Sequence, residues 1–145
     1  MINDLYNEKI LSLAANVPRL GRLDNPDGSA TNRSRLCGSQ VTVDVAMREG
    51  RITDFAHEVK ACALGQASSA IMAKTAIGAT VDELEAVKAA MEAMLKEGGP
   101  PPNGRWAELA CLEPVRDHKA RHASTLLTFG ATLEAAKEAA AAVPG

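Results

Sequence analysis

Alternation of apolar and polar residues predicts three strands in the first half of the chain. One set of apolar residues recurs at every second position, the period of a strand with one buried face: Val41, Val43, Val45 and Met47. After a turn at Glu49-Gly50, residues 51–61 return as the partner strand. One face of that strand carries Phe55, His57, Val59 and Ala61. The polar segment 29–36 is expected to add an edge strand, so the three strands form an antiparallel meander.

Apolar residues spaced three or four apart predict helices in the rest of the chain. The first covers residues 3–16 and cannot continue past Pro18. Small residues dominate 63–76, which is typical of a closely packed helix. Thr80 followed by Glu83 is a capping-box pattern that begins another helix. After a loop at 96–104, a short helix at 106–112 is expected to end at Pro114, and a closing helix runs from about His118 to Ala142.

Strands followed by helices, without β-α alternation, predict one α+β domain over residues 1–145: a three-stranded antiparallel sheet with helices packed on one face. The formal charge of -2 and the pI near 5.9 give no reason to expect nucleic acid as a partner. No signal peptide and no apolar run of membrane-spanning length are present. We therefore expect a cytoplasmic protein with no membrane partner.

The basic residues are unevenly spread, and several stand near the segments that carry cysteine or histidine. They are Arg19, Arg22, Arg33, Arg35, Arg116, Lys119 and Arg121. A solvated face and a docking surface for an acidic partner or substrate are both compatible with this distribution.

Three cysteines at wide spacings, Cys37, Cys62 and Cys111, predict free thiols or metal ligands in a reducing compartment. Cys62 is expected to end a strand and begin a helix, where unpaired N–H groups and the helix dipole favour the thiolate. Cys37 precedes the other strand of the same hairpin. Since a hairpin returns its ends to one edge, the two thiols should be neighbours. Such a pair suggests a soft-metal or iron–sulfur site, or a reactive pair; two unrelated buried thiols are the alternative.

Other residues that bind metals in proteins have a structural interpretation as well. His122, near the start of the closing helix, is either a third ligand or a surface residue. His57 lies between apolar neighbours and is expected to be a core or interstrand histidine. Cys111, in an apolar run, is typical of a buried structural thiol. The chain contains no Ser-His-Asp spacing, phosphate-binding glycine loop or His-Glu-x-x-His motif.

The order of motifs resembles the NifU-like family of iron–sulfur cluster assembly scaffolds, which includes the IscU-type and SufU-type proteins. The motifs that carry the resemblance span nearly the whole chain: Asn25-Pro26, Leu36-Cys37-Gly38, Phe55, Ala61-Cys62-Ala63, Ala67-Ser68-Ser69-Ala70 and a histidine-led final helix. The resemblance implies a SufE/NifU-like fold, which agrees with the sheet and helices predicted above. It also implies a scaffold or carrier rather than an enzyme.

The resemblance implies Cys37, Cys62 and His122 as ligands for a transient iron–sulfur cluster or for zinc. Two positions depart from the family pattern, because Ser39 stands in place of an aspartate and Ala123 in place of a third cysteine. The fourth ligand is then open among Cys111, Asp117, Ser39, water and a thiol of a partner chain.

Further expectations concern partners and alternative functions. The implied partners are a cysteine desulfurase and the apoproteins that receive clusters, whereas the family's chaperone-recognition motif is absent. One alternative function is a persulfide acceptor, with Cys62 taking sulfur from the desulfurase. Another is an interaction module of the same fold that has lost its chemistry.

Overall fold

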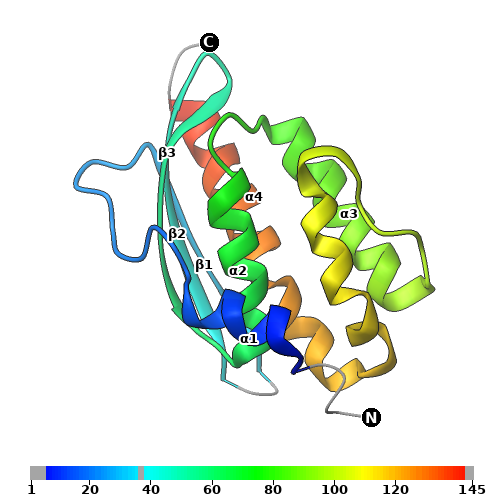
Figure 1. Ribbon diagram of the computed structural model, residues 1–145. Coiled ribbons are helices and arrows are strands. Elements are labelled where there is room, and N and C mark those ends of the chain that lie inside the picture. Colours follow the sequence, from blue (N-terminus) through cyan, green and yellow to red (C-terminus); the bar gives the residue numbers. More distant parts are fainter. Residues whose placement is uncertain (1–5, 36–37, 143–145) are drawn as a thin grey trace.

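The sheet of the computed structural model, which describes residues 6–35 and 38–142, has the predicted meander order. Its strands are β1 (Gly28–Arg33), β2 (Gln40–Arg48) and β3 (Arg51–Lys60), and both pairings are antiparallel (Figure 1). Arg33 pairs with Gln40, and Gln40 pairs with Lys60, so these three residues mark one end of the sheet. The predicted α+β class with a three-stranded antiparallel sheet is confirmed.

A bulge in β3 sets which of its residues face the helices. Ala46 pairs with Asp54 but Met47 pairs with Ile52, so Thr53 is an extra residue on β3. Ile52 and Phe55 are therefore both buried although they are three positions apart. Ala61 lies beyond the end of β3, so the prediction that it belongs to the strand is wrong.

The helical segments among the described residues are α1 (Glu8–Ala15), α2 (Ala63–Thr75), α3 (Val81–Glu97), η2 (Gly104–Asp117), η3 (Lys119–Arg121) and α4 (His122–Ala142). The predicted capping of α3 is confirmed, because the Thr80 side chain accepts a hydrogen bond from the backbone N–H of Glu83. No helix among the described residues has the length and apolar character needed to cross a bilayer.

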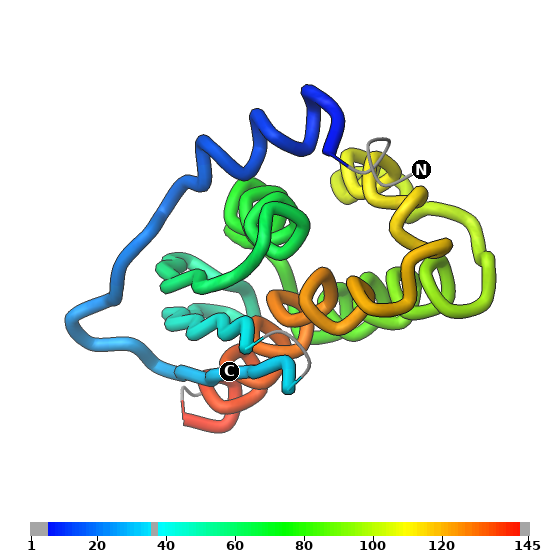
Figure 2. Tube along the Cα trace, turned by 90° about the horizontal axis from the view of Figure 1, so that it is seen from below, coloured from blue at the N-terminus to red at the C-terminus, as the bar shows by residue number. Residues whose placement is uncertain are grey.

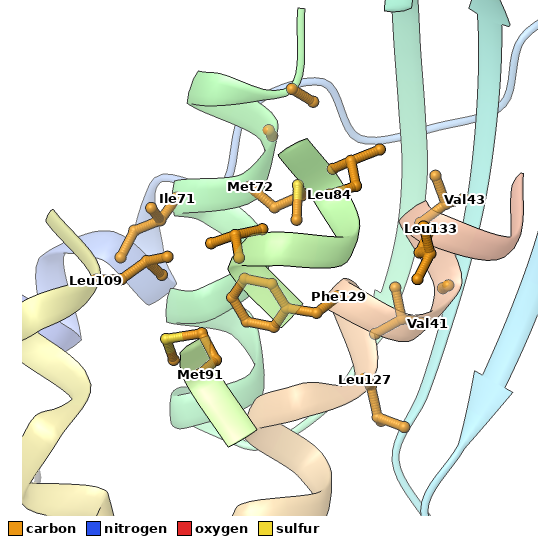
Figure 3. Packing of buried hydrophobic residues seen from close by; sticks show 14 of the residues in the cluster. Val41, Val43, Ile71, Met72, Leu84, Met91, Leu109, Leu127, Phe129 and Leu133 are labelled. Carbon is orange, nitrogen blue, oxygen red and sulfur yellow. The ribbon is translucent and has the colours of Figure 1, made fainter. Parts of the chain in front are cut away.

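The helices are stacked in layers on one face of the sheet. The long helix α4 lies against β1 and β2, α2 lies beside it against β3, and α3 and η2 form the outer layer (Figure 1). Seen from below, α2 and α4 lie side by side, and α1 lies across the view next to α2 (Figure 2). Phe129 of α4 lies in the middle of the core, between the sheet residue Val41 and the α3 residue Met91 (Figure 3).

The segment between α3 and α4 differs from its prediction. The helix expected at 106–112 is a 3-10 helix over Gly104–Asp117, and Pro114 lies inside it. The proline ring fixes the backbone angle φ near about -65°, which lies within the range of a 3-10 helix. The missing N–H of proline removes only one hydrogen bond. The closing α-helix begins at His122 instead of His118, because the 3-10 turn η3 precedes it.

The outer edge of β3 is covered at two places. Near His57, the N–H of Gly21 donates to the His57 carbonyl at 2.8 Å, and the N–H of His57 donates to the Arg19 carbonyl at 3.2 Å. Near Ile52, the N–H of Gly78 donates to the Ile52 carbonyl at 2.7 Å. Segments before β1 and after α2 therefore satisfy backbone groups that an edge strand leaves unpaired.

Asp44 anchors the loop before β1 to the sheet. The buried carboxylate of Asp44 accepts hydrogen bonds from the Arg22 guanidinium at 2.7 and 3.0 Å, from the Ser29 hydroxyl and from the Leu23 N–H. Burial disfavours the charged form, but these donors outweigh it and hold the pKa of Asp44 below its usual range.

Candidate functional site

Cys62 stands where β3 gives way to α2, as predicted. It is the N-cap residue of α2, with extended backbone angles, and its side chain makes no capping hydrogen bond. The thiol is half-buried and forms no disulfide. A cysteine in this position has the first-turn N–H groups of the helix beside it and keeps its sulfur available for another partner.

The thiol of Cys62 meets the first turn of α4. Its Sγ lies 3.5 Å from the Oγ of Ser124, which is 1% exposed and lies 3.2 Å from the Arg121 carbonyl oxygen. Sequence reasoning did not single out Ser124. Its small polar side chain, in a helix that is otherwise rich in alanine and leucine, was the available signal.

Gly65 permits this contact between the two helices. A Cβ at position 65 would lie 3.0 Å from the backbone oxygen of Ser124 and 2.6 Å from the Cβ of Ala61. Only glycine allows the first turn of α2 to approach α4 so closely without displacing one of these groups. The role of Gly65 was not predicted from the sequence either, because a glycine inside a run of small residues has no distinctive spacing.

His122 is the first residue of α4 and is 7% exposed, so its interpretation as a surface residue is wrong. Its Nε2 lies 3.1 Å from the carbonyl oxygens of both Val115 and Arg116 at the end of η2. Because carbonyl oxygens only accept, we assign the N–H to Nε2. The lone pair is then on Nδ1, which is the ring nitrogen that can bind a metal.

A cavity of about 460 Å³ lies beside His122. Its walls come from the end of α3, the end of η2, η3 and the start of α4: Leu95, Lys96, Arg116, Lys119, His122 and Ala123. Ala123, at the position of the missing cysteine, is exposed and lines this cavity. The space that a third cysteine would occupy is thus open and bordered by cations.

Cys111 occupies a different setting. It lies in η2, half-buried and packed against the core, with Lys9 and Glu108 nearby. Burial raises the pKa of the Cys111 thiol, which favours its protonated form. This environment agrees with the interpretation as a structural thiol.

Cys37 lies outside the described residues, so its predicted proximity to Cys62 stays a prediction. The described ends of its loop are joined by two hydrogen bonds, from the Ser34 N–H to the Ser39 carbonyl and from the Gly38 N–H to the Ser34 carbonyl. The loop leads into Gln40, which pairs with Lys60 of β3. Within residues 6–35 and 38–142, no three His, Cys, Asp or Glu side chains come together as a metal-binding group.

His57 is a core residue, as predicted. It is fully buried on the helix-facing side of β3, and its ring lies edge-on to Phe55 at 5.0 Å between centroids. Its Nε2 lies 2.8 Å from the carbonyl oxygen of Pro18, and its buried Nδ1 has no hydrogen-bond partner. Burial lowers the pKa of His57 more than the Pro18 carbonyl raises it, so the ring is neutral near pH 7.

Comparison with known proteins covers nearly the whole chain. The family model described as the NifU-like N terminal domain matches residues 5–125. The crystal structure of a nitrogen-fixing NifU-like protein (N-terminal) from Brucella abortus has 58% sequence identity and a TM-score of 0.94. The match covers 98% of this chain and 99% of that one.

More distant relatives share the fold. The iron–sulfur cluster assembly scaffold protein IscU of Thermotoga maritima is 25% identical over 134 residues, which are 92% of this chain and 94% of that protein. FiSufU from Fervidobacterium islandicum AW-1 is 23% identical with a TM-score of 0.83, covering 91% of this chain and 96% of its own. The sheet and helices described above are therefore a shared architecture.

Proposed function

Because the chain belongs to the family of NifU-like N terminal domains, as its sequence predicted, we propose that it is an assembly scaffold for iron–sulfur clusters. The observation that carries the proposal is the Cys62 thiol, half-buried at the start of α2 and in contact with the first turn of the helix that begins with His122. The cluster is the cargo of this site and leaves it for a recipient.

Three residues hold the cargo in this proposal: Cys37, Cys62 and His122. Thiolate and imidazole are donors that suit iron in clusters and also zinc. Hydrogen bonds from Nε2 to two carbonyls fix the His122 ring and leave the Nδ1 lone pair as the one that can bind the cargo. Three protein ligands leave a fourth position for water, Ser39, Asp117 or a thiol of a partner chain, and an open position suits a protein that must release its cargo. The half-buried Cys111, whose raised pKa favours the protonated thiol, is the weakest candidate.

Zinc would use the same donors. When bound, zinc would coordinate the thiolates, and it would supply no redox chemistry because the ion does not change its oxidation state. The chain's own contribution is the same for either metal: α2 and α4 present one thiol and one oriented imidazole. We expect a scaffold or carrier without turnover of its own, which receives sulfur from a cysteine desulfurase and delivers clusters to apoproteins.

The first test is anaerobic reconstitution with iron, sulfide and thiol, followed by visible absorption and metal analysis. Wild type should develop a cluster chromophore, and Cys62→Ala, Cys37→Ala and His122→Ala should each lose it or bind less iron. Cys111→Ala is the matched control, since it removes a thiol outside the proposed site. A chromophore of equal intensity in Cys62→Ala would refute the proposal.

A second function is a persulfide acceptor, and the partial exposure of Cys62 favours it. The Cys62 thiolate would attack the outer sulfur of a persulfide on a cysteine desulfurase. The S–S bond of the donor breaks, its cysteine leaves as a thiolate, and Cys62 keeps the extra sulfur. Mass spectrometry after incubation with a desulfurase and cysteine should then find one added sulfur on Cys62. Such an adduct, without a chromophore on reconstitution, would favour the acceptor over the scaffold.

A further inference from the structure

The positive side chains divide into two groups by their partners. Of the 16 lysines and arginines, seven form ion pairs with carboxylates: Lys9, Arg22, Arg48, Arg51, Lys74, Lys88 and Arg105. The others form no ion pair within the described residues: Arg19, Arg33, Arg35, Lys60, Lys96, Arg116, Lys119, Arg121 and Lys137. These nine cations are available to an anion from outside the chain wherever several of them lie together on the surface.

Most of these unpaired cations lie at the end of the molecule that carries Cys62. Arg33 and Lys60 flank Gln40 across the sheet, and Arg35 follows β1 at that end. Arg121 belongs to the turn that leads into α4, and its carbonyl oxygen contacts Ser124. We call this part of the surface the Cys62 end. A docking surface for an acidic partner was one of the two interpretations of these residues.

The remaining three unpaired cations at this end line one cavity. Lys96 comes from α3, Arg116 from η2 and Lys119 from η3, and all three border the cavity of about 460 Å³ beside His122. All three side chains are exposed. Glu97 and Asp117 are the acidic residues next to them in the chain, and neither forms an ion pair among the described residues. Three cations from separate elements, held around one hollow without a carboxylate, favour an anion from outside the chain.

We propose that the cavity lined by Lys96, Arg116 and Lys119 binds a carboxylate side chain from an acidic segment of the protein that exchanges sulfur or a cluster with this chain. The guanidinium of Arg116 suits a carboxylate because it offers two parallel N–H donors. A partner docked there lies next to His122 and Ala123, two residues that line the cavity. Ala123 directly precedes Ser124, which contacts the Cys62 thiol. The exchange itself rests on the proposed function, whereas the binding of a carboxylate does not.

Binding is tested first without any partner protein. ¹⁵N-labelled protein is titrated with hexaglutamate in 50 mM NaCl, and amide shifts are followed by NMR. Saturable shifts are expected around residues 116–123. Arg116→Glu and Lys119→Glu should each weaken the apparent affinity at least threefold. Lys137→Glu is the matched control, because Lys137 is an exposed, unpaired cation in the last third of the same helix α4. Equal weakening by Lys137→Glu, or shifts spread over all the lysines, would overturn the proposal.

The second arm measures sulfur transfer from a purified cysteine desulfurase to this chain. Arg116→Glu and Lys119→Glu should raise KM at least threefold and leave the rate at saturation unchanged, with a weaker dependence of KM on salt than wild type shows. An unchanged KM in both variants would overturn the proposal. Binding of another anion in the cavity, such as inorganic phosphate, would not rescue it. Hexaglutamate binding by a protein that never loads iron, sulfide or persulfide would refute the scaffold function and leave the carboxylate site standing.

Discussion

Gly65→Ala should destabilise the fold, because the methyl group enters the contact between α2 and α4. It would lie 2.6 Å from the Cβ of Ala61 and 3.0 Å from the backbone oxygen of Ser124, against about 3.5–4.0 Å for an unstrained contact. Neither neighbour can move by a rotamer change, since one is a Cβ and the other a carbonyl oxygen. We therefore take the upper part of the usual cost of overpacking, about 3 kcal/mol.

The same substitution also has a favourable effect. Alanine is a better helix former than glycine by about 1 kcal/mol. The net loss in free energy of unfolding is then about 2 kcal/mol. For a chain of this size that corresponds to a fall in Tm of about 4–8 °C. Urea unfolding and calorimetry on wild type and Gly65→Ala measure both quantities.

A double variant separates the two contacts. In Ala61→Gly/Gly65→Ala the nearer contact is gone, so the pair should be more stable than the sum of the single changes by about 1 kcal/mol. A Gly65→Ala protein as stable as wild type, or more stable, would refute the argument that glycine is needed for the approach of α2 to α4. The alkylation rate of Cys62 should change in Gly65→Ala as well, since Ser124 is the group displaced.

Three further changes test other contacts. Ser124→Ala should speed alkylation of Cys62 by iodoacetamide near pH 7.5 roughly fivefold. The Ser124 hydroxyl donates to the Arg121 carbonyl, so it accepts from the Cys62 thiol, and the variant frees the sulfur from a hydrogen bond worth about 1 kcal/mol; an unchanged rate would contradict this. Because burial lowers the pKa of His57 in the folded state, the unfolded chain binds more protons than the folded one below about pH 6.5. The free energy of unfolding should therefore decrease as the pH is lowered, by up to about 1.4 kcal/mol per pH unit. His57→Gln should remove that part of the slope in urea unfolding between pH 7.5 and 5.5, and a slope equal to that of wild type would count against it. Asp44→Asn should lower the free energy of unfolding by about 2 kcal/mol, since the buried charge that holds Arg22 is lost; loss of less than half that value would mean that Arg22 is satisfied by water.

The strands and the position of Cys62 were predictable because they depend on local pattern. The two-residue period in β2 and the change to small residues after Cys62 are visible in a single sequence. The turn at Glu49-Gly50 likewise follows from residue type. These features need no knowledge of what packs against them.

The parts that were missed depend on contacts between distant segments. Ser124 and Gly65 become significant only when α2 and α4 meet, and they are 59 positions apart in the chain. The direction of the His122 ring is set by carbonyl groups of η2, whose 3-10 geometry through Pro114 the sequence did not indicate. Burial of His122 was therefore outside the reach of spacing arguments.

The covered edge of β3 bears on how the sheet meets other chains. Residues 19–21 and 78–79 occupy backbone groups of β3 near His57 and Ile52, so a foreign strand finds no continuous row of donors and acceptors there. In the part of the chain that the structure describes, the other sheet edge is β1, which is six residues long and carries a charged residue, Arg33, at its end. Short, charged edges are poor templates for strand addition. Edge-to-edge joining of sheets between copies of the protein is therefore disfavoured, and its helices and loops are the surfaces left for contacts with other proteins.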